Sequence, residues 1–509
     1  MQGQHSLNMA EIEIKFVTRH NALALFLDTV VPVLSDMGMD VSKAHEKQLQ
    51  NDYYDTSNHD FQHQKMGFRV RGNNGRFEQT LKTHGRVSGG LHERAEYNIP
   101  LKDAQPDLRL FDKDVWPPEW DADVINTKLA RQFSTHFTRT AFEVGCHGSV
   151  IELVFDEGEV KTGKARAPIQ EIELELLEGQ VSELFLLATV LNEKLELRLS
   201  DVSKAAQGYQ LLHGVNPQVK PLPAFLQLHE EETTENAFAK SAQCALAHWQ
   251  HHEHLYLETG SVKMLSEVAD SLRLLLQSVS LYLPVLQCPE MLELHKQVMK
   301  FMQVWIWQED LQSLRYLLSK KSLFNKCLSK YPSLLSYLQG RKAGLIHAHA
   351  PDALFYDKAS TQIKIMVSEI LYSRPWREHA KGYDMPVTEH AKGWLSQDWQ
   401  AVQQSLPRAQ AMGPANYIAI ENMLRQTMWN GFLLADLFPA ERDQFRAPWL
   451  DILTGIEELK ALLVLKQTLR ESELESQEEL MQWVEDKTNN LLNVMERTRQ
   501  VGMQSDVYW

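Results

Sequence analysis

Charged residues recur at every second position along a series of short β-type segments, and this pattern constrains the fold more than any other sequence feature. Near the start of the chain, Glu11, Glu13 and Lys15 alternate with apolar residues. Much later, Glu171 and Glu173 follow the same rule. Because strand side chains point alternately to opposite faces, each such strand has one charged face and one apolar face. The strands must bury their apolar faces on one side and gather their charges on the other.

Eight β-type segments, separated by Gly, Asn and Asp, precede residue 215. They are Ala10–Arg19, Gln48–Asp55, Gly67–Arg71, Arg76–Lys82, Leu91–Ile99, His136–Val144, Gly148–Glu157 and Ala167–Leu177. Eight strands suit a small closed barrel, so we predict an antiparallel β-barrel with a charged lumen. Helices are expected at Asn21–Met37, Ala122–Phe133 and Val181–Leu195, and after Ser203.

The pattern of apolar residues changes near residue 215, where helical periodicity replaces the β pattern. We therefore predict an α+β chain with a tunnel domain at 9–212, a Pro-rich linker at 213–224 and an all-α helical-bundle domain at 225–509. Residues 1–8 are polar and patternless, and Met9-Ala10 has the character of a natural start, so an upstream extension or a cloning remnant is expected there.

Composition narrows the function classes. The 509 residues carry a formal net charge of −15, which argues against a nucleic-acid or anionic-membrane partner. The four cysteines form no C-x-x-C pair, so no zinc or redox motif is indicated and a cytoplasmic location is expected. The longest apolar stretch, Leu272–Leu286, is interrupted by polar residues and is expected to be a buried helix.

The charged faces of the barrel indicate a ligand. On one strand alone, an exposed sheet face explains such a pattern well, but six strands repeat it. Charges that face a lumen are costly unless they are paired, hydrated or liganded. Carboxylates bind hard cations, and arginine forks match phosphate oxygens. Acidic and basic rows together therefore predict a metal-chelated phosphate chain as the ligand.

These residues resemble a known family. Glu11-Ile-Glu13-Ile-Lys15 is similar to the E-x-E-x-K signature of the CYTH domain, the triphosphate tunnel metalloenzymes. The resemblance continues in order over about residues 10–212, and the second half resembles a CHAD helical domain. The ordered motifs are Tyr53-Tyr54-Asp55-Thr56, Arg69-Val-Arg71, Thr80-Leu-Lys82, Glu93-Arg94-Ala-Glu96, Phe137-Thr-Arg139, Asp156-Glu-Gly158, Glu171-Ile-Glu173-Leu-Glu175 and Ser203-Lys204-Ala205 with Gly208-Tyr209.

The resemblance to CYTH–CHAD inorganic triphosphatases implies hydrolysis of tripolyphosphate to pyrophosphate and phosphate with Mg²⁺ or Mn²⁺, using two ions. The implied catalytic residues are Lys15, Glu171 and Glu173. The implied metal ligands are Glu11, Glu13, Glu171 and Glu173, with Asp156 and Glu96 as further ligands or orienting residues. The implied substrate-binding residues are Lys15, Arg69, Arg71, Lys82, Arg94, Arg139 and Lys204.

Alternatives stay open at this point. The same fold is compatible with a nucleoside or thiamine triphosphatase or a class IV adenylate cyclase, and the helical half with a polyphosphate-binding scaffold. Residues 220–509 hold 29 Lys/Arg and 35 Asp/Glu, and the basic CHAD motif is reduced to Arg273. Long-chain polyphosphate or a protein therefore remain open partners for that half. The run His251-His252-x-His254 is expected at the surface near a helix end.

Overall fold

The computed structural model describes residues 10–19, 21–73, 75–88, 90–163, 165–214, 218–407, 410–471 and 477–509. Residues 1–9 and residues 215–217 of the predicted linker lie outside this description. Contacts divide the chain into two compact units, one of residues 1–218 with 355–373 and one of residues 219–354 with 374–509.

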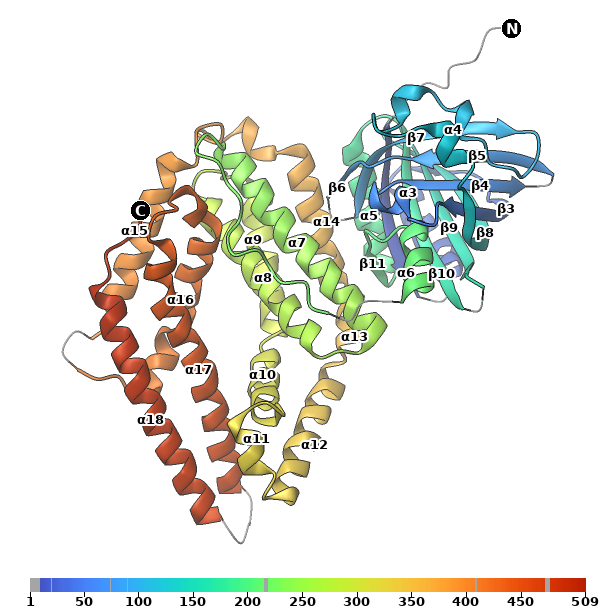
Figure 1. Cartoon of the computed structure of the whole chain (residues 1–509). Helices are drawn as coiled ribbons and strands as arrows, with labels where there is room; N and C mark the ends of the chain where they lie inside the picture. Colours follow the sequence, from blue (N-terminus) through green and yellow to red (C-terminus); the bar gives the residue numbers. More distant parts are fainter. Residues whose placement is uncertain are drawn as a thin grey trace. The chain divides into compact units, whose positions relative to one another are not determined.

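Within the described residues, eight antiparallel strands close into a barrel, which confirms the predicted fold and all eight predicted segments (Figure 1). Short strands β2 (Asp40–Val41), β6 (Arg86–Ser88) and β11 (Leu197–Leu199) pair with β8, β7 and β1 respectively. Around the barrel the order is β1 (Ala10–Thr18), β10 (Arg166–Glu178), β9 (Ser149–Lys161), β8 (Ala130–Cys146), β3 (His45–Asp55), β4 (Gly67–Asn73), β5 (Arg76–Lys82) and β7 (Leu91–Leu101), which pairs again with β1.

The apolar alternates of the strands form the outer core of the barrel, as expected. Ile14 and Phe16 on β1 are at most 1% exposed. They pack in one cluster with residues of the N-terminal helical segment and of α5 (Val181–Lys194). The N-terminal segment consists of α1 (Ala22–Leu25), the π-helix η1 (Phe26–Val30) and α2 (Val31–Asp36), so a helix is confirmed there and at the position of α5.

The predicted helix Ala122–Phe133 is wrong in its second half. Helix α4 (Ala122–Asn126) is short, and strand β8 begins at Ala130. Phe133 stacks on Tyr53 of β3 with ring centroids 4.8 Å apart, and the two residues are paired in the sheet. Long-range strand pairing thus overrides the local helical pattern.

Helix α6 (Lys204–His213) begins directly after Ser203, as predicted, and packs against β8, β9 and β10. The Ser203 Oγ caps it by accepting a hydrogen bond from the Ala206 N–H at 3.1 Å. Gly208 allows the close approach to the barrel, because a Cβ there would lie 2.0 Å from the ring of Phe133. Helix α6 therefore holds Lys204 at the lumen.

The first unit also contains α14 (Lys358–Ser373), which the sequence pattern did not assign to the barrel. It packs against α5 and β11. Asn192 of α5 donates a hydrogen bond to the carbonyl of Lys358 at 3.0 Å, and Thr361 donates one to the carbonyl of Leu197. A segment from the second half of the sequence is thus part of the barrel unit.

The second unit is helical, which confirms the predicted fold class of this half. Its described helices are α7 (Thr234–Thr259), α8 (Lys263–Tyr282), α9 (Pro289–Val304), α10 (Trp307–Leu318), α11 (Leu323–Leu328), α12 (Pro332–His349), α13 (Pro351–Leu354), η4 (Pro375–Glu378), α15 (Thr388–Ser405), α16 (Pro414–Leu434), η5 (Ala435–Leu437), α17 (Arg442–Glu471) and α18 (Gln477–Gln504). None of the helices in the described part of the chain has the length and apolarity needed to cross a membrane.

The surface interpretation of the histidine run is wrong for His252. Helix α7 continues to Thr259, so the run lies inside the helix and not at its end. His252 is 0% exposed, and its Nδ1 bonds to the carbonyl of His248 at 2.8 Å.

Candidate active site

The barrel lumen encloses a cavity of about 1390 Å³ that collects the predicted site residues. Eleven of the thirteen line it: Glu11, Glu13, Lys15, Arg69, Arg71, Lys82, Arg94, Glu96, Arg139, Glu173 and Lys204. The other two, Asp156 and Glu171, are buried and form ion pairs with Lys204 at 2.8 and 2.6 Å. Residues scattered over more than 190 positions of sequence thus meet in one place.

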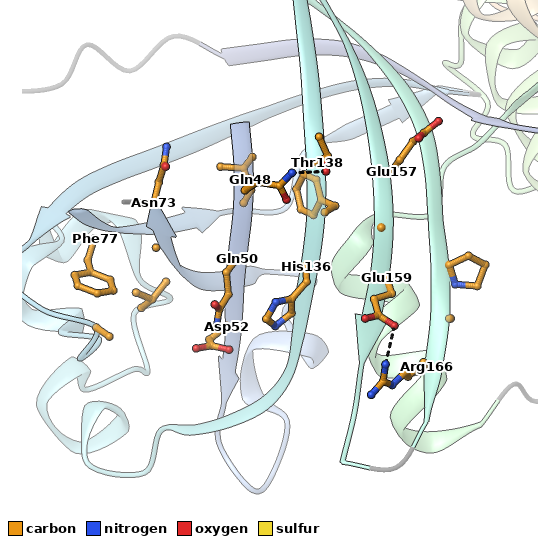
Figure 2. Close-up of a pocket in the computed structure, with 18 of the residues that line it drawn as sticks. Gln48, Gln50, Asp52, Asn73, Phe77, His136, Thr138, Glu157, Glu159 and Arg166 are labelled. Atoms are coloured by element: carbon orange, nitrogen blue, oxygen red, sulfur yellow. Dashed lines mark hydrogen bonds and ion pairs between the residues drawn. The ribbon is translucent and has the colours of Figure 1, made fainter. Parts of the chain in front are cut away.

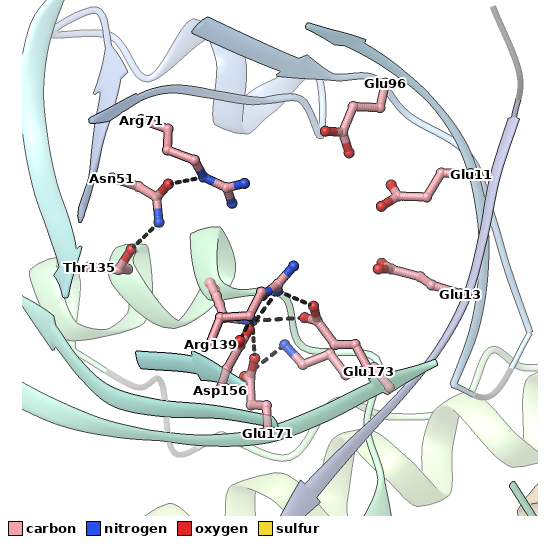
Figure 3. A network of polar contacts seen from close by, with 12 residues as sticks. Glu11, Glu13, Asn51, Arg71, Glu96, Thr135, Arg139, Asp156, Glu171 and Glu173 are labelled. Atoms are coloured by element: carbon pink, nitrogen blue, oxygen red, sulfur yellow. Dashed lines mark hydrogen bonds and ion pairs between the residues drawn. The ribbon is translucent and has the colours of Figure 1, made fainter. Parts of the chain in front are cut away.

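One wall of the lumen is acidic. Figure 3 shows Glu11, Glu13 and Glu96 projecting from it. Lys82 Nζ lies 2.7 Å from a Glu11 oxygen and 2.6 Å from a Glu96 oxygen, and Arg94 Nη2 lies 2.6 Å from Glu13. Burial nevertheless raises the pKa of Glu11 to about 8, and the charges of Glu13 and Glu96 add to this effect. Burial thus disfavours the charged form of Glu11 even though Lys82 pairs with it.

A second acidic group lies deeper in the barrel. One oxygen each of Asp156, Glu171 and Glu173 lie within 4.8 Å of one another. Lys204 Nζ sits among them, at 2.8, 2.6 and 2.7 Å, and Arg139 bridges Asp156 and Glu173. The ammonium group of Lys204 occupies the kind of position that a bound cation takes between carboxylates.

The opposite wall is cationic (Figure 3). Arg71 has no ion pair within the described residues; its Nε donates to Asn51 Oδ1 at 2.8 Å, and Asn51 in turn donates to Thr135 at 2.9 Å. Burial lowers the pKa of Arg71 to about 9, and the charges of Arg69 and Arg139 lower it further. A guanidinium that is held in place, partly desolvated and repelled by two others is a strong site for an anion.

Lys15 is the most enclosed of the predicted cations. Its side chain is 3% exposed, and its Nζ lies 2.7 Å from Glu171 and donates to the carbonyl of Val202 at 2.7 Å. These contacts fix its position at the edge of the lumen, next to the deeper acidic group.

Glu152, Glu175 and Asn51 received no role from the sequence pattern, although Glu175 was expected on the charged face. Glu152 and Glu175 are paired across β9 and β10 and line the cavity, and Asn51 holds Arg71. Burial raises the pKa of Glu175 to about 7. A signal existed for Glu152, because it shares the strand parity of Asp156, but the apolar Val154 between them hides the charged row.

The donor set fits divalent cations. Hard ions such as Mg²⁺ and Mn²⁺ bind carboxylate oxygens, and both acidic groups supply several of these in close proximity. Burial raises the pKa of both Glu11 and Glu175, so these two carboxylates would gain most from such an ion. The buried Nε atoms of Arg69 and Arg94, which lack hydrogen-bond partners among the described atoms, fit an anion in the same cavity.

A second cavity, of about 980 Å³, is lined by residues of several barrel strands (Figure 2). Gln48, Gln50, His136 and Thr138 line it, and they have the strand parity opposite to that of the lumen residues. None of the predicted site residues belongs to this lining. The lumen is therefore the candidate active site.

Known proteins are similar to parts of this chain. An inorganic triphosphatase from Haemophilus influenzae is 39% identical over 163 residues, which are 32% of this chain and 46% of that protein, so the chain spans about half of that relative. A candidate adenylyl cyclase from Hippeastrum, described as having a dominant triphosphatase activity, is 19% identical with a TM-score of 0.30, over 39% of this chain and 95% of that one.

A CHAD domain structure from Ricinus communis is 14% identical with a TM-score of 0.43, over 56% of this chain and 98% of that one. The family model for the CYTH domain matches residues 9–209, which include the whole barrel and the first part of helix α6. The barrel thus lies within the part of the chain that is similar to the CYTH domain family.

Proposed function

We propose that the lumen hydrolyses inorganic tripolyphosphate to pyrophosphate and phosphate with Mg²⁺ or Mn²⁺. The observation that carries this proposal is the opposition, within one cavity, of an acidic wall around Glu11 and a cationic wall around Arg71. A phosphate chain with bound divalent cations offers positive ions to the acidic wall and negative phosphate oxygens to the cationic wall. Simple anion binding would need no carboxylates.

The cationic side chains of the lumen would bind the phosphate oxygens. Arg71 is already oriented by Asn51, so little side-chain entropy is lost when an anion binds. Arg69 and Arg139 lie next to it and would share the charge of the same chain. Substrate contacts are assigned to Lys15, Arg69, Arg71, Lys82, Arg94, Arg139 and Lys204.

The carboxylates would hold two cations. Glu11, Glu13, Glu171 and Glu173 are assigned as the main ligands, and Asp156 and Glu96 would bind or orient them. When bound, the ions supply charge neutralisation and a water of lowered pKa. The chain itself would position the substrate, since the lumen carboxylates and guanidiniums come from strands of one closed sheet.

The similarity to an inorganic triphosphatase over 163 residues supports this substrate. The competing functions are those of a nucleoside or thiamine triphosphatase and of an adenylate cyclase. They need the same phosphate site and differ in which group beyond the phosphates the tunnel mouth admits. For the helical unit we propose long-chain polyphosphate or a protein as the partner. The proposed hydrolysis in the barrel does not depend on that partner.

The test is phosphate release from tripolyphosphate, ATP and thiamine triphosphate side by side, with Mg²⁺, with Mn²⁺ and with a chelator. We expect tripolyphosphate to give the highest kcat/KM and the chelator to abolish turnover. A preference for ATP by orders of magnitude, or formation of cyclic AMP, would exclude the inorganic substrate. Full activity in chelator would exclude the metal.

A further inference from the structure

A cysteine, a histidine and a glutamate converge at the end of the β8–β9 hairpin. Cys146 Sγ donates to Glu183 Oε2 at 2.9 Å, and His147 Nδ1 lies 2.9 Å from the same oxygen. Cys146 Sγ and His147 Nδ1 are 3.9 Å apart. Three atoms that all ligate zinc in proteins therefore lie within 4 Å of one another.

The fold holds these side chains in place. His147 and Gly148 form the two-residue turn between β8 and β9, both with positive φ, at 44° and 87°. The first turn of α5 supplies Glu183. The Ser149 hydroxyl accepts a hydrogen bond from the backbone of Gln180 at 3.0 Å, so the start of α5 is tied to the same hairpin.

This cluster is separate from the lumen site. Cys146 is 1% exposed and belongs to the outer core of the barrel, with Phe142, Val144 and Ile151. None of the three clustered residues lines the lumen cavity. A ligand bound here would not touch the phosphate site.

The geometry does not match that of a nucleophile triad. In a Cys-His-Glu triad the imidazole uses one ring nitrogen toward the thiol and the other toward the carboxylate. Here the same atom, Nδ1 of His147, faces both Cys146 and Glu183. A relay of protons through the ring is therefore excluded, whereas convergence on one point suits a shared cation.

We propose that Cys146, His147 and Glu183 form a binding site for a Zn²⁺-class metal ion, which fastens the β8–β9 hairpin to helix α5. Tetrahedral zinc with sulfur at about 2.3 Å and nitrogen or oxygen at about 2.0–2.2 Å places its ligand atoms about 3.3–3.6 Å apart. The three measured separations, 2.9, 2.9 and 3.9 Å, bracket this range and need shifts below about 1 Å.

Binding has a simple proton balance. The ion takes the place of the thiol proton, which leaves to solvent, so that Cys146 binds as a thiolate. The imidazole binds through Nδ1 as its Nε2–H tautomer. The side chain of His147 is 53% exposed, so water has access from this side and supplies the fourth ligand.

The experiment is a Co²⁺ titration of the metal-free full-length protein, followed by absorbance. Tetrahedral Co²⁺ bound to a thiolate gives intense visible and near-ultraviolet bands, whereas carboxylate and water ligands in the lumen give no thiolate band. We expect the band to saturate once Co²⁺ exceeds the capacity of this site and of the lumen together, and excess Zn²⁺ to remove it. The variant Cys146→Ser should abolish it.

Matched variants make the result decisive. Cys288→Ser removes another buried cysteine and should retain the full band. His147→Asn keeps a residue that tolerates positive φ. The single variants His147→Asn and Glu183→Gln should each weaken Co²⁺ binding about tenfold or more. Far-ultraviolet circular dichroism and tripolyphosphate turnover should stay unchanged in Cys146→Ser, so a failure of the lumen proposal would be seen separately.

The proposal is overturned by three outcomes. One is a wild-type protein that gives no thiolate band with excess Co²⁺. Another is a band of unchanged intensity in Cys146→Ser. The third is a band that depends on Cys146 but is unaffected by both His147→Asn and Glu183→Gln, which would show a single thiolate and not a built site.

Discussion

Arg71 is expected to destabilise the protein when no anion is bound. Its pKa falls from the ordinary 12.5 to about 9, through burial first and then the neighbouring Arg69 and Arg139. This change corresponds to an unfavourable free energy on the order of 5 kcal/mol for the charged form, as an upper value. The guanidinium is charged in both states at neutral pH, so the cost is fully present below about pH 9 and declines at higher pH.

Replacing Arg71 by methionine removes this cost but leaves the buried Asn51 oxygen without its donor, a loss of about 1–3 kcal/mol. We therefore expect Arg71→Met to raise the free energy of unfolding by about 1–3 kcal/mol in phosphate-free buffer. Tripolyphosphate should stabilise the wild type strongly and the variant weakly. Urea unfolding with and without tripolyphosphate measures both effects.

The exposed Arg76 of strand β5 provides the control, since Arg76→Met should leave both quantities unchanged within about 0.5 kcal/mol. The reasoning is refuted if Arg71→Met is less stable than the wild type in phosphate-free buffer. It is also refuted if tripolyphosphate stabilises the variant as much as the wild type.

Three further predictions concern the lumen and its support. Glu13→Gln should keep the fold, by circular dichroism, and lower metal-dependent turnover by about 10²-fold or more; wild-type kcat at saturating Mn²⁺ would remove Glu13 from the metal site. Lys204→Met should cost about 3–5 kcal/mol of stability in chelator, because Asp156, Glu171 and Glu173 each lose one of their cations, and Mn²⁺ should restore part of it; no response of the melting temperature to Mn²⁺ would speak against a metal there. Gly208→Ala should cost about 1–3 kcal/mol, because its Cβ would overlap the ring of Phe133, while Gly163→Ala, which faces open space, should cost almost nothing; equal melting temperatures for the two variants would show that α6 is not held at that distance.

Much of the barrel could be predicted because its strands carry the constraint locally. Each lumen strand alternates charge with apolar residues, and period-two alternation shows in the sequence without any tertiary information. The start of β8 could not be predicted in this way. Its helical pattern up to Phe133 is overridden by stacking on Tyr53, a contact across about 80 residues of chain.

The assignment of α14 to the barrel unit was also beyond the sequence. An amphipathic helix shows that one face is buried but does not name its partner. The partner is decided by contacts such as that of Asn192 with the backbone of Lys358, which join segments more than 160 residues apart. The proposed domain limits at 212 and 225 rest on the change from a β-type to a helical sequence pattern, and they stay predictions.

The candidate site, too, could be predicted from the sequence only in part. Strand parity was enough to bring Glu11, Glu13 and Arg71 into one lumen. It could not show that Lys204 lies among Asp156, Glu171 and Glu173, because that contact depends on the path of α6 over β8, β9 and β10. The support of Arg71 by Asn51 was invisible for another reason, since a neutral amide does not mark a charged row.

The central claim is that the lumen holds a phosphate chain between metal-bound carboxylates and the arginine wall. A crystal soaked with Mn²⁺ and a non-hydrolysable tripolyphosphate analogue, with anomalous data collected at the manganese edge, tests it most directly. The account predicts anomalous peaks beside the carboxylates of β1 and β10 and analogue phosphates on Arg69, Arg71 and Arg139. Manganese or analogue bound only outside the barrel, with the lumen side chains still paired to one another, would contradict it.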